Sequence, residues 1–154
     1  MTQRMNYATA APSGMKALGS VSDYITHSGL PATLIDLVYL RVSQVNGCAY
    51  CIDMHGRDLL KAGMPVEKVL LVSAWDEAGL VFRDQERAAL KWADVVTRVS
   101  ETHVPDDAYA EARVTFTEKQ LADLTIAVAL INAYNRLAIS FRATLLTTAS
   151  VEAA

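Results

Sequence analysis

Apolar residues recur at helical spacing along nearly the whole chain, and this pattern limits the fold more than any other feature. In segment 31–45, Leu34, Leu37, Val38 and Val42 fall at positions i, i+3, i+4 and i+8. Such spacing places side chains on one face of an α-helix. Sustained alternation of apolar and polar residues, which is typical of half-buried strands, is scarce. The sequence therefore predicts an all-α fold.

Residues that begin or end helices divide this pattern into segments. Pro31 and Pro65 each suit a first helical turn, and Gly29 suits the end of the first helix. Thr117 followed by Glu118 is typical of the cap of a long final helix. We expect a compact bundle of about six or seven helices, over residues 13–27, 31–45, 47–63, 65–75, 84–100, a short acidic helix from 105, and 117–146.

The last predicted helix is apolar almost all round between Leu124 and Leu130, which indicates a place in the core or at an interface. Apolar residues make up 52% of the chain and its mean hydropathy is +0.19, high for a soluble monomer of this size. No apolar run approaches the roughly 18 to 20 residues that span a bilayer, so we expect no membrane helix. We expect the surplus to cover a subunit interface, and hence a homo-oligomer.

Length and charge limit the class of protein further. The 154 residues suit one core, and no linker divides them, so we expect residues 1–154 to form a single domain. The net charge is −3, and no basic stripe indicates a nucleic-acid binder. The first twenty residues lack the apolar core of a signal peptide, which favours the cytoplasm. Thiols are reduced there, so a purely structural disulfide is a poor explanation for the two cysteines.

Both cysteines lie in the stretch "NGCAYCIDMH", residues 46–55. Cys48, Cys51 and His55 fall at i, i+3 and i+7, so a helix places them on one face. Asn46 and Gly47 interrupt the preceding helix and put Cys48 at a helix N-terminus, where a thiolate is stabilised. His55 lies one turn beyond Cys51 and can act as its base. The helix end thus favours Cys48 as the attacking thiol, whereas the histidine favours Cys51 and is the more specific signal.

Other interpretations of this stretch compete with a redox pair. The cysteines could be inert core residues, an interpretation that the base on the same helix face weakens. Zinc would need a fourth ligand beside Cys48, Cys51 and His55, and neither His27 nor His103 has a ligand-like spacing. A thioredoxin fold is disfavoured because the pair does not follow a strand. We expect a redox dithiol with neither metal nor cofactor.

The segment from Leu40 to Gly63, "LRVSQVNGCAYCIDMHGRDLLKAG", resembles the signature of the alkylhydroperoxidase D-like (AhpD-like) proteins of the carboxymuconolactone decarboxylase superfamily. The resemblance continues through "WDEAGLVFRDQERAALKWADVVT" and "LTIAVALINAYNRLAISFR", so it covers most of the chain. It implies an all-helical fold that forms trimers, or hexamers by pairing trimers. It also implies a dithiol that reduces peroxides or exchanges disulfides.

The resemblance implies a role for each residue of the site. Cys51 would attack the peroxide and Cys48 would resolve the product into a disulfide. His55, together with a carboxylate one helix earlier at Asp36, would relay the proton. The implied activity is that of a thiol-dependent alkyl hydroperoxide reductase, with a hydroperoxide as substrate. An external dithiol, such as a lipoyl-bearing protein, would be the electron donor.

Two residues depart from the family pattern. Asp36 stands where the peroxidases carry a glutamate, and it is either part of the relay or a surface acid paired with Arg41 or Lys61. Tyr50 stands where the well-studied peroxidase carries a histidine. It either donates a hydrogen bond near the thiols or packs at an interface.

Asn132 and Asn135 are buried-polar candidates in the apolar last helix, and they either face the site or join helices by hydrogen bonds. Two functions compete with the peroxidase. One is a non-peroxidatic disulfide reductase or redox sensor that uses the same cysteines. The other is a lactone decarboxylase of the same superfamily, against which the cysteine pair argues.

Overall fold

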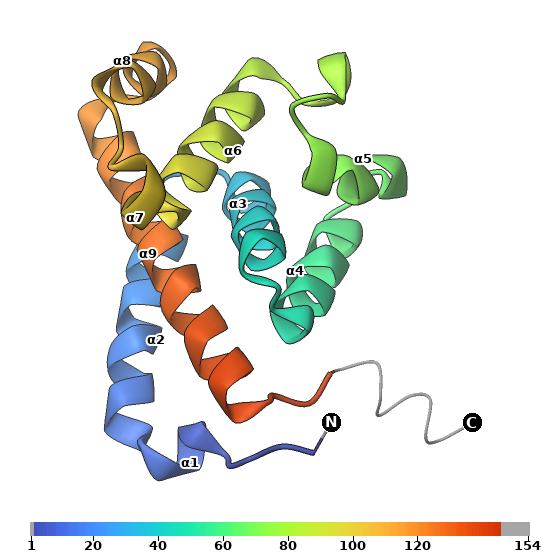
Figure 1. Cartoon of the computed structure of the whole chain (residues 1–154), viewed down its shortest axis with the longest axis vertical. Helices are drawn as coiled ribbons and strands as arrows, with labels where there is room; N and C mark the ends of the chain where they lie inside the picture. Colours follow the sequence, from blue (N-terminus) through green and yellow to red (C-terminus); the bar gives the residue numbers. More distant parts are fainter. Residues whose placement is uncertain (1, 146–154) are drawn as a thin grey trace.

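The computed structural model describes residues 2–145, which form a bundle of helices around α3 (Figure 1). Within this range there are nine α-helices, two short 3-10 helices and no strands. The elements in chain order are α1 (Tyr7–Ala10), α2 (Pro12–Thr26), α3 (Ala32–Asn46), α4 (Ala49–Lys61), α5 (Val66–Leu71), η1 (Val72–Ala74), η2 (Gly79–Val81), α6 (Asp84–Thr97), α7 (Val99–Thr102), α8 (Asp106–Thr115) and α9 (Glu118–Phe141).

The predicted all-α fold is confirmed, with differences at helix ends. The four-residue helices α1 and α7 add to the predicted set, and η1 replaces the last turn of the helix predicted over 65–75. The helix predicted over 117–146 ends at Phe141, because Arg142 adopts a left-handed conformation (φ 55°). The N–H of Ala143 then donates a hydrogen bond to the carbonyl of Ala138 at 2.9 Å. Leu146, the last residue of the predicted helix, lies outside the described residues.

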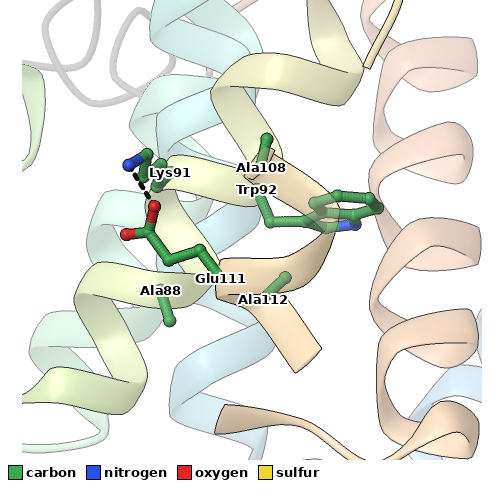
Figure 2. A pocket seen from close by; sticks show the side chains of 6 residues that line it. All are labelled: Ala88, Lys91, Trp92, Ala108, Glu111 and Ala112. Carbon is green, nitrogen blue, oxygen red and sulfur yellow. Dashed lines mark hydrogen bonds and ion pairs between the residues drawn. The ribbon is translucent and has the colours of Figure 1, made fainter. Parts of the chain in front are cut away.

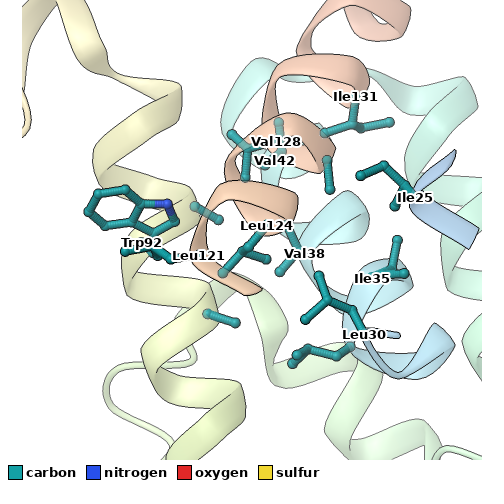
Figure 3. Packing of buried hydrophobic residues seen from close by; sticks show 14 of the residues in the cluster. Ile25, Leu30, Ile35, Val38, Val42, Trp92, Leu121, Leu124, Val128 and Ile131 are labelled. Atoms are coloured by element: carbon teal, nitrogen blue, oxygen red, sulfur yellow. The ribbon is translucent and has the colours of Figure 1, made fainter. Parts of the chain in front are cut away.

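Helix α3 occupies the middle of the bundle because it packs against α4, α6 and α9. Val38 and Val42 of α3 are fully buried, as are Leu124 and Val128 of α9. Figure 3 shows these four side chains within one buried cluster. Complete burial of such a side chain stabilises a fold by roughly 1.5–3 kcal/mol. The contact therefore fixes α9 against the helix that leads into the cysteine stretch.

Helix α9 is long and apolar enough, by length and composition alone, to cross a membrane. The sequence shows no uninterrupted apolar run of that length, and we expected no membrane helix, yet the mean hydropathy of α9 reaches 1.4 over an 18-residue window. Its packing against α2, α3 and α6 accounts for part of this composition, because 39% of the apolar window is buried. The predicted cap is present: Thr117 Oγ1 accepts a hydrogen bond from the Gln120 N–H at 3.2 Å, and the Thr117 N–H donates to Gln120 Oε1 at 3.0 Å.

A buried carboxylate joins α5 to the start of α6. Glu86 is 3% exposed and accepts hydrogen bonds from Lys68 Nζ at 2.6 Å, from the Arg83 N–H at 2.8 Å and from Arg83 Nη2 at 3.0 Å. Burial alone would raise the pKa of Glu86, but the hydrogen bonds from Arg83 and Lys68 outweigh it and lower the pKa below its usual value. The carboxylate is therefore ionised at neutral pH and holds its three donors together.

The contact between α6 and α8 is closely packed. Figure 2 shows the ion pair between Lys91 and Glu111 beside Ala88 and Ala112. The gap enclosed there measures about 10 Å³, which is room for one water molecule at most. The gap at this contact is therefore too small for a ligand.

Candidate redox site

The junction between α3 and α4 places the cysteines. Gly47 ends α3 in a left-handed conformation (φ 71°), which glycine adopts without steric cost. The Cys48 N–H then bonds back to the carbonyl of Ser43 at 2.9 Å, and Cys48 becomes the N-cap of α4. Its Sγ accepts a hydrogen bond from the Cys51 N–H at 3.4 Å. The predicted break at Asn46 and Gly47 and the predicted position of Cys48 are both present.

Cys48 and Cys51 are joined by a disulfide, with their Cα atoms 5.4 Å apart. Both residues are buried, at 1% and 2% exposure. His55 follows Cys51 by one turn on the same helix and is also buried. The structure thus brings the three residues of the predicted stripe together at the N-terminal half of α4, where it packs against α3.

The imidazole of His55 is held from α3. Its Nδ1 lies 3.2 Å from Asp36 Oδ1, and because an ionised carboxylate can only accept, Nδ1 carries the proton. The lone pair then sits on Nε2. That atom is buried and has no hydrogen-bond partner among the described residues. A buried nitrogen without a partner is unusual in a folded protein and suits an atom that exchanges a proton.

The other partners considered for Asp36 are engaged elsewhere. Arg41 makes a two-pronged pair with Asp94, at 2.6 and 2.7 Å. Lys61 pairs with Asp58 at 3.1 Å. Asp36 instead bonds to the buried imidazole, and its own side chain is 27% exposed. Asp36 therefore makes neither of the surface pairs considered for it and bonds to His55 instead.

Tyr39 is a site residue that the sequence analysis missed. Its ring centroid lies 5.0 Å from that of His55, with the planes tilted by 58°. Burial raises the pKa of Tyr39, and the charge of Asp36 and the proximity of Tyr134 raise it further. The hydroxyl therefore stays protonated well into the alkaline range. A signal was available, because Tyr39 follows Asp36 by three residues and shares its helix face.

An amide network fixes the residue just before the Gly47 break. Asn46 Nδ2 donates to Asn132 Oδ1 and to Asn135 Oδ1, both at 2.9 Å. Asn135, which is fully buried, donates through Nδ2 to Ser43 Oγ at 3.1 Å. Asn132 and Asn135 thus join helices by hydrogen bonds, one of the two roles expected of them. The sequence identifies Asn46 only as part of a helix break, whereas in the structure its side-chain amide also joins α3 to α9 by hydrogen bonds.

A hollow of about 540 Å³ opens beside the dithiol. Cys48 and Tyr50 line it from the start of α4, and residues from the C-terminal end of α9 line the opposite side. Arg4 and Arg142 also belong to its lining. Tyr50 is half-buried and packs against the main core cluster. Tyr50 therefore contributes to the wall of this hollow as well as to the core.

One group of described side chains could hold a cation, and it differs from the cysteine set considered for zinc. Ligand atoms of Asp36, His55 and Asp58 lie within 4.8 Å of one another. The two cysteines are bonded to each other instead. Because Asp36 already bonds to His55 and Asp58 to Lys61, we assign no metal to these residues.

The comparisons with known proteins decide the family. Residues 12–95 match the carboxymuconolactone decarboxylase family. The chain belongs to this family. An uncharacterised protein of Bacillus subtilis, YdfG, is 36% identical over 140 residues, which are 91% of this chain and 95% of that protein.

Solved structures place the chain among the AhpD-like members of the superfamily. A protein of unknown function from Agrobacterium tumefaciens, named as a candidate AhpD antioxidant-defence protein, is 39% identical with a TM-score of 0.90. The match covers 94% of this chain and 98% of that one. An uncharacterised peroxidase-related protein from Ralstonia eutropha with an AhpD core is 20% identical, with a TM-score of 0.79 over 90% of this chain and 74% of that one. The second likeness concerns the fold alone, and the resemblance inferred from the sequence is confirmed.

Proposed function

We propose that this protein is a thiol-dependent peroxidase that reduces alkyl hydroperoxides through the Cys48–Cys51 dithiol. The observation that carries the proposal is the combination on α4 of a bonded cysteine pair with a buried histidine one turn away. The Nδ1 of this histidine faces a carboxylate, and its Nε2 has no partner within residues 2–145. A thiolate with a positioned base is an activated nucleophile. A second cysteine within bonding distance lets the oxidised product close into a disulfide.

The proposed cycle has three steps. The Cys51 thiolate attacks the terminal oxygen of the hydroperoxide, the O–O bond breaks, and a sulfenic acid and an alcohol result. The Cys48 thiol then condenses with the sulfenic acid, releasing water and forming the disulfide. An external dithiol finally reduces the disulfide to two thiols and is itself oxidised.

His55 and Asp36 support the first step by moving a proton. His55 Nε2 takes the proton of the Cys51 thiol, and the imidazolium that forms is stabilised by Asp36 at 3.2 Å. The proton then passes to the alkoxide that leaves, so that the product is a neutral alcohol. Tyr39 packs against the ring and limits its rotation, which keeps Nδ1 directed at the carboxylate.

Two cysteine variants test the proposal. Peroxide turnover with cumene hydroperoxide, coupled to a dihydrolipoamide donor, is expected to vanish in Cys51→Ser. In Cys48→Ser the sulfenic acid has no resolving partner, so mass spectrometry should find it trapped, or as a mixed disulfide. Both variants keep the size of the side chain. Peroxide turnover at the wild-type rate in Cys51→Ser would overturn the proposal.

The same experiment separates the competing functions. A redox sensor or a disulfide reductase without peroxidase activity would form the Cys48–Cys51 disulfide with peroxide or disulfide substrates. It would show no repeated peroxide turnover with any dithiol donor. A lactone decarboxylase would release CO2 from a muconolactone-type substrate, and alkylation of both thiols would leave that release unchanged.

The exposed apolar surface supports the expected homo-oligomer. Three apolar side chains, Leu70, Leu80 and Val114, are 70%, 103% and 88% exposed. Where such side chains form one contiguous patch, a neighbouring subunit commonly covers them. We propose a trimer or a hexamer, and light scattering coupled to gel filtration measures the mass directly. A monomer at micromolar concentration would contradict this.

A further inference from the structure

The hollow beside Cys48 has no role in the peroxide step as described above. We propose that it is the binding site of the reducing thiol, that the thiol carries an anionic group, and that it attacks Cys48 Sγ. This inference rests on the proposed function in one respect, because the disulfide must be reduced in each cycle. The step forms a bond between the donor sulfur and Cys48 Sγ, breaks the Cys48–Cys51 bond and releases Cys51 as a thiolate.

Access favours Cys48 over Cys51. The hollow of about 540 Å³ is lined by Cys48, and Cys51 is not part of its lining. Both cysteines are almost fully buried, and Cys51 lies one turn further along α4, toward His55. Thiol–disulfide exchange needs an approach to the sulfur that is attacked, so access decides which bond forms. A volume of this size accepts an unbranched dithiol of lipoic-acid size with its alkyl arm.

The leaving group fits the same assignment. The helix N-terminus would stabilise a Cys48 thiolate, and that effect alone would favour attack on Cys51. Attack on Cys48, however, releases the Cys51 thiolate, which lies one turn from His55, and the proton lost by the donor thiol can pass through His55 Nε2 to that thiolate. The released thiol is then the one that meets the next peroxide. The donor sulfur stays on Cys48 until the donor's second thiol attacks it, which forms the donor's own disulfide and releases Cys48 as a free thiol.

The charges around the hollow indicate the chemistry of the donor. Arg4 and Arg142 line it, and no described acidic side chain does. Arg4 is held in place, since its Nη1 donates to the carbonyl of Ser140 at 3.0 Å and its N–H donates to the carbonyl of Phe141 at 3.0 Å. Arg142 follows directly as the cap of α9. Two guanidinium groups beside an apolar wall suit an alkyl dithiol that ends in a carboxylate.

The first measurement identifies the attacked sulfur and needs no peroxide. Oxidised protein is mixed with excess 3-mercaptopropionate, quenched in acid at millisecond intervals, alkylated with N-ethylmaleimide and sequenced by mass spectrometry. We expect the donor on Cys48 and the maleimide on Cys51. The opposite placement, or an equal mixture, overturns the proposal.

The second measurement tests whether the hollow prefers an anionic donor. It decides the proposal if the mixed disulfide is too short-lived to trap. Dihydrolipoate and dihydrolipoamide share one dithiol arm and differ in their terminal charge. We expect the oxidised protein to be reduced about threefold to tenfold faster by the acid, as two exposed cations allow. The ratio should fall toward one in the double variant Arg4→Gln, Arg142→Gln, and in 0.5 M salt. A ratio of one in the wild type overturns the proposal.

The double variant Arg57→Gln, Lys61→Gln is the matched control, because it removes the same two positive charges from α4 at positions that do not line the hollow. Lys61 is 76% exposed and lies roughly 18 Å along the helix from the cysteine end. The ratio in this control should equal that of the wild type, and an equal loss in this variant would assign the effect to overall charge. Both measurements start from the disulfide, so they can fail while Cys51→Ser still confirms the peroxidase, and the reverse also holds.

Discussion

Replacing Asp36 by asparagine tests the carboxylate of the relay with almost no change in volume. The variant keeps a hydrogen-bond acceptor for His55 Nδ1 but removes the charge that stabilises the imidazolium. Hydrogen bonds to charged groups contribute about 1.5–3 kcal/mol. The distance of 3.2 Å is at the long end of the range, and the Asp36 side chain is 27% exposed, so solvent screens part of the interaction. We therefore expect a loss of about 1 to 1.5 kcal/mol in the transition state.

This loss corresponds to a kcat/KM for peroxide that is about 5- to 15-fold lower at neutral pH. Asp58→Asn is the matched control. Its carboxylate lies on the same side of α4 and within 4.8 Å of the relay, but it pairs with Lys61. We expect less than a twofold change for this control. Asp36→Glu, which restores the family residue, should keep at least the wild-type rate.

The assay is initial-rate peroxide consumption with a dihydrolipoamide donor, measured from pH 5 to 9. A relay role predicts that Asp36→Asn displaces the pH profile as well as lowering it, whereas a purely structural role would lower it uniformly. Thermal unfolding shows whether the variant is folded. Equal losses in Asp36→Asn and Asp58→Asn, or a rate within twofold of wild type in the former, would refute the relay.

Three further predictions concern stability and are read by urea unfolding. The pKa of Glu86 is lower in the folded chain than in the unfolded one, so its contribution is complete above about pH 4.5 and is lost as the pH falls through the folded-state value; Glu86→Gln should flatten this acid dependence. Asn46→Ala removes a donor from the buried Asn135 and from the half-buried Asn132 and should cost about 1–3 kcal/mol, whereas a cost below 0.5 kcal/mol would contradict the network. Gly47→Ala places a side chain at φ 71° and should cost about 1–2 kcal/mol, while Gly56→Ala, inside α4 with open space around it, should stabilise by about 0.5–1 kcal/mol.

Local signals in the sequence were sufficient to predict the helices and to place the two cysteines and His55 on one face of one helix. The spacing of Cys48, Cys51 and His55 describes one face of one helix, and helical geometry alone brings such residues together. Gly47 marks a helix end because few other residues adopt its conformation. These inferences need no knowledge of how the helices pack. They are confirmed by the structure for that reason.

The remainder of the site depends on which helices meet, and that information is not local. The partner of Asp36 could be chosen only after the structure showed that Arg41 is engaged by Asp94, 53 residues away. The bond between Asn46 and Asn132 spans 86 residues. The hollow is lined both by Arg4, near the N-terminus, and by the C-terminal end of α9. Helix ends were also misplaced where backbone conformation decides them, as at Arg142.

The contact between α3 and α9 has a consequence for how the protein fluctuates. Its apolar side chains are fully buried, and the hydrogen bonds of its asparagine side chains join α3 to α9. Segments of this kind open last, so we expect the amides of α3 and α9 to show the slowest hydrogen exchange. The short peripheral elements α5, η1 and η2 should exchange early. Because the cysteine stretch is attached to the slowest part of the molecule, transient opening of its periphery leaves the dithiol in position.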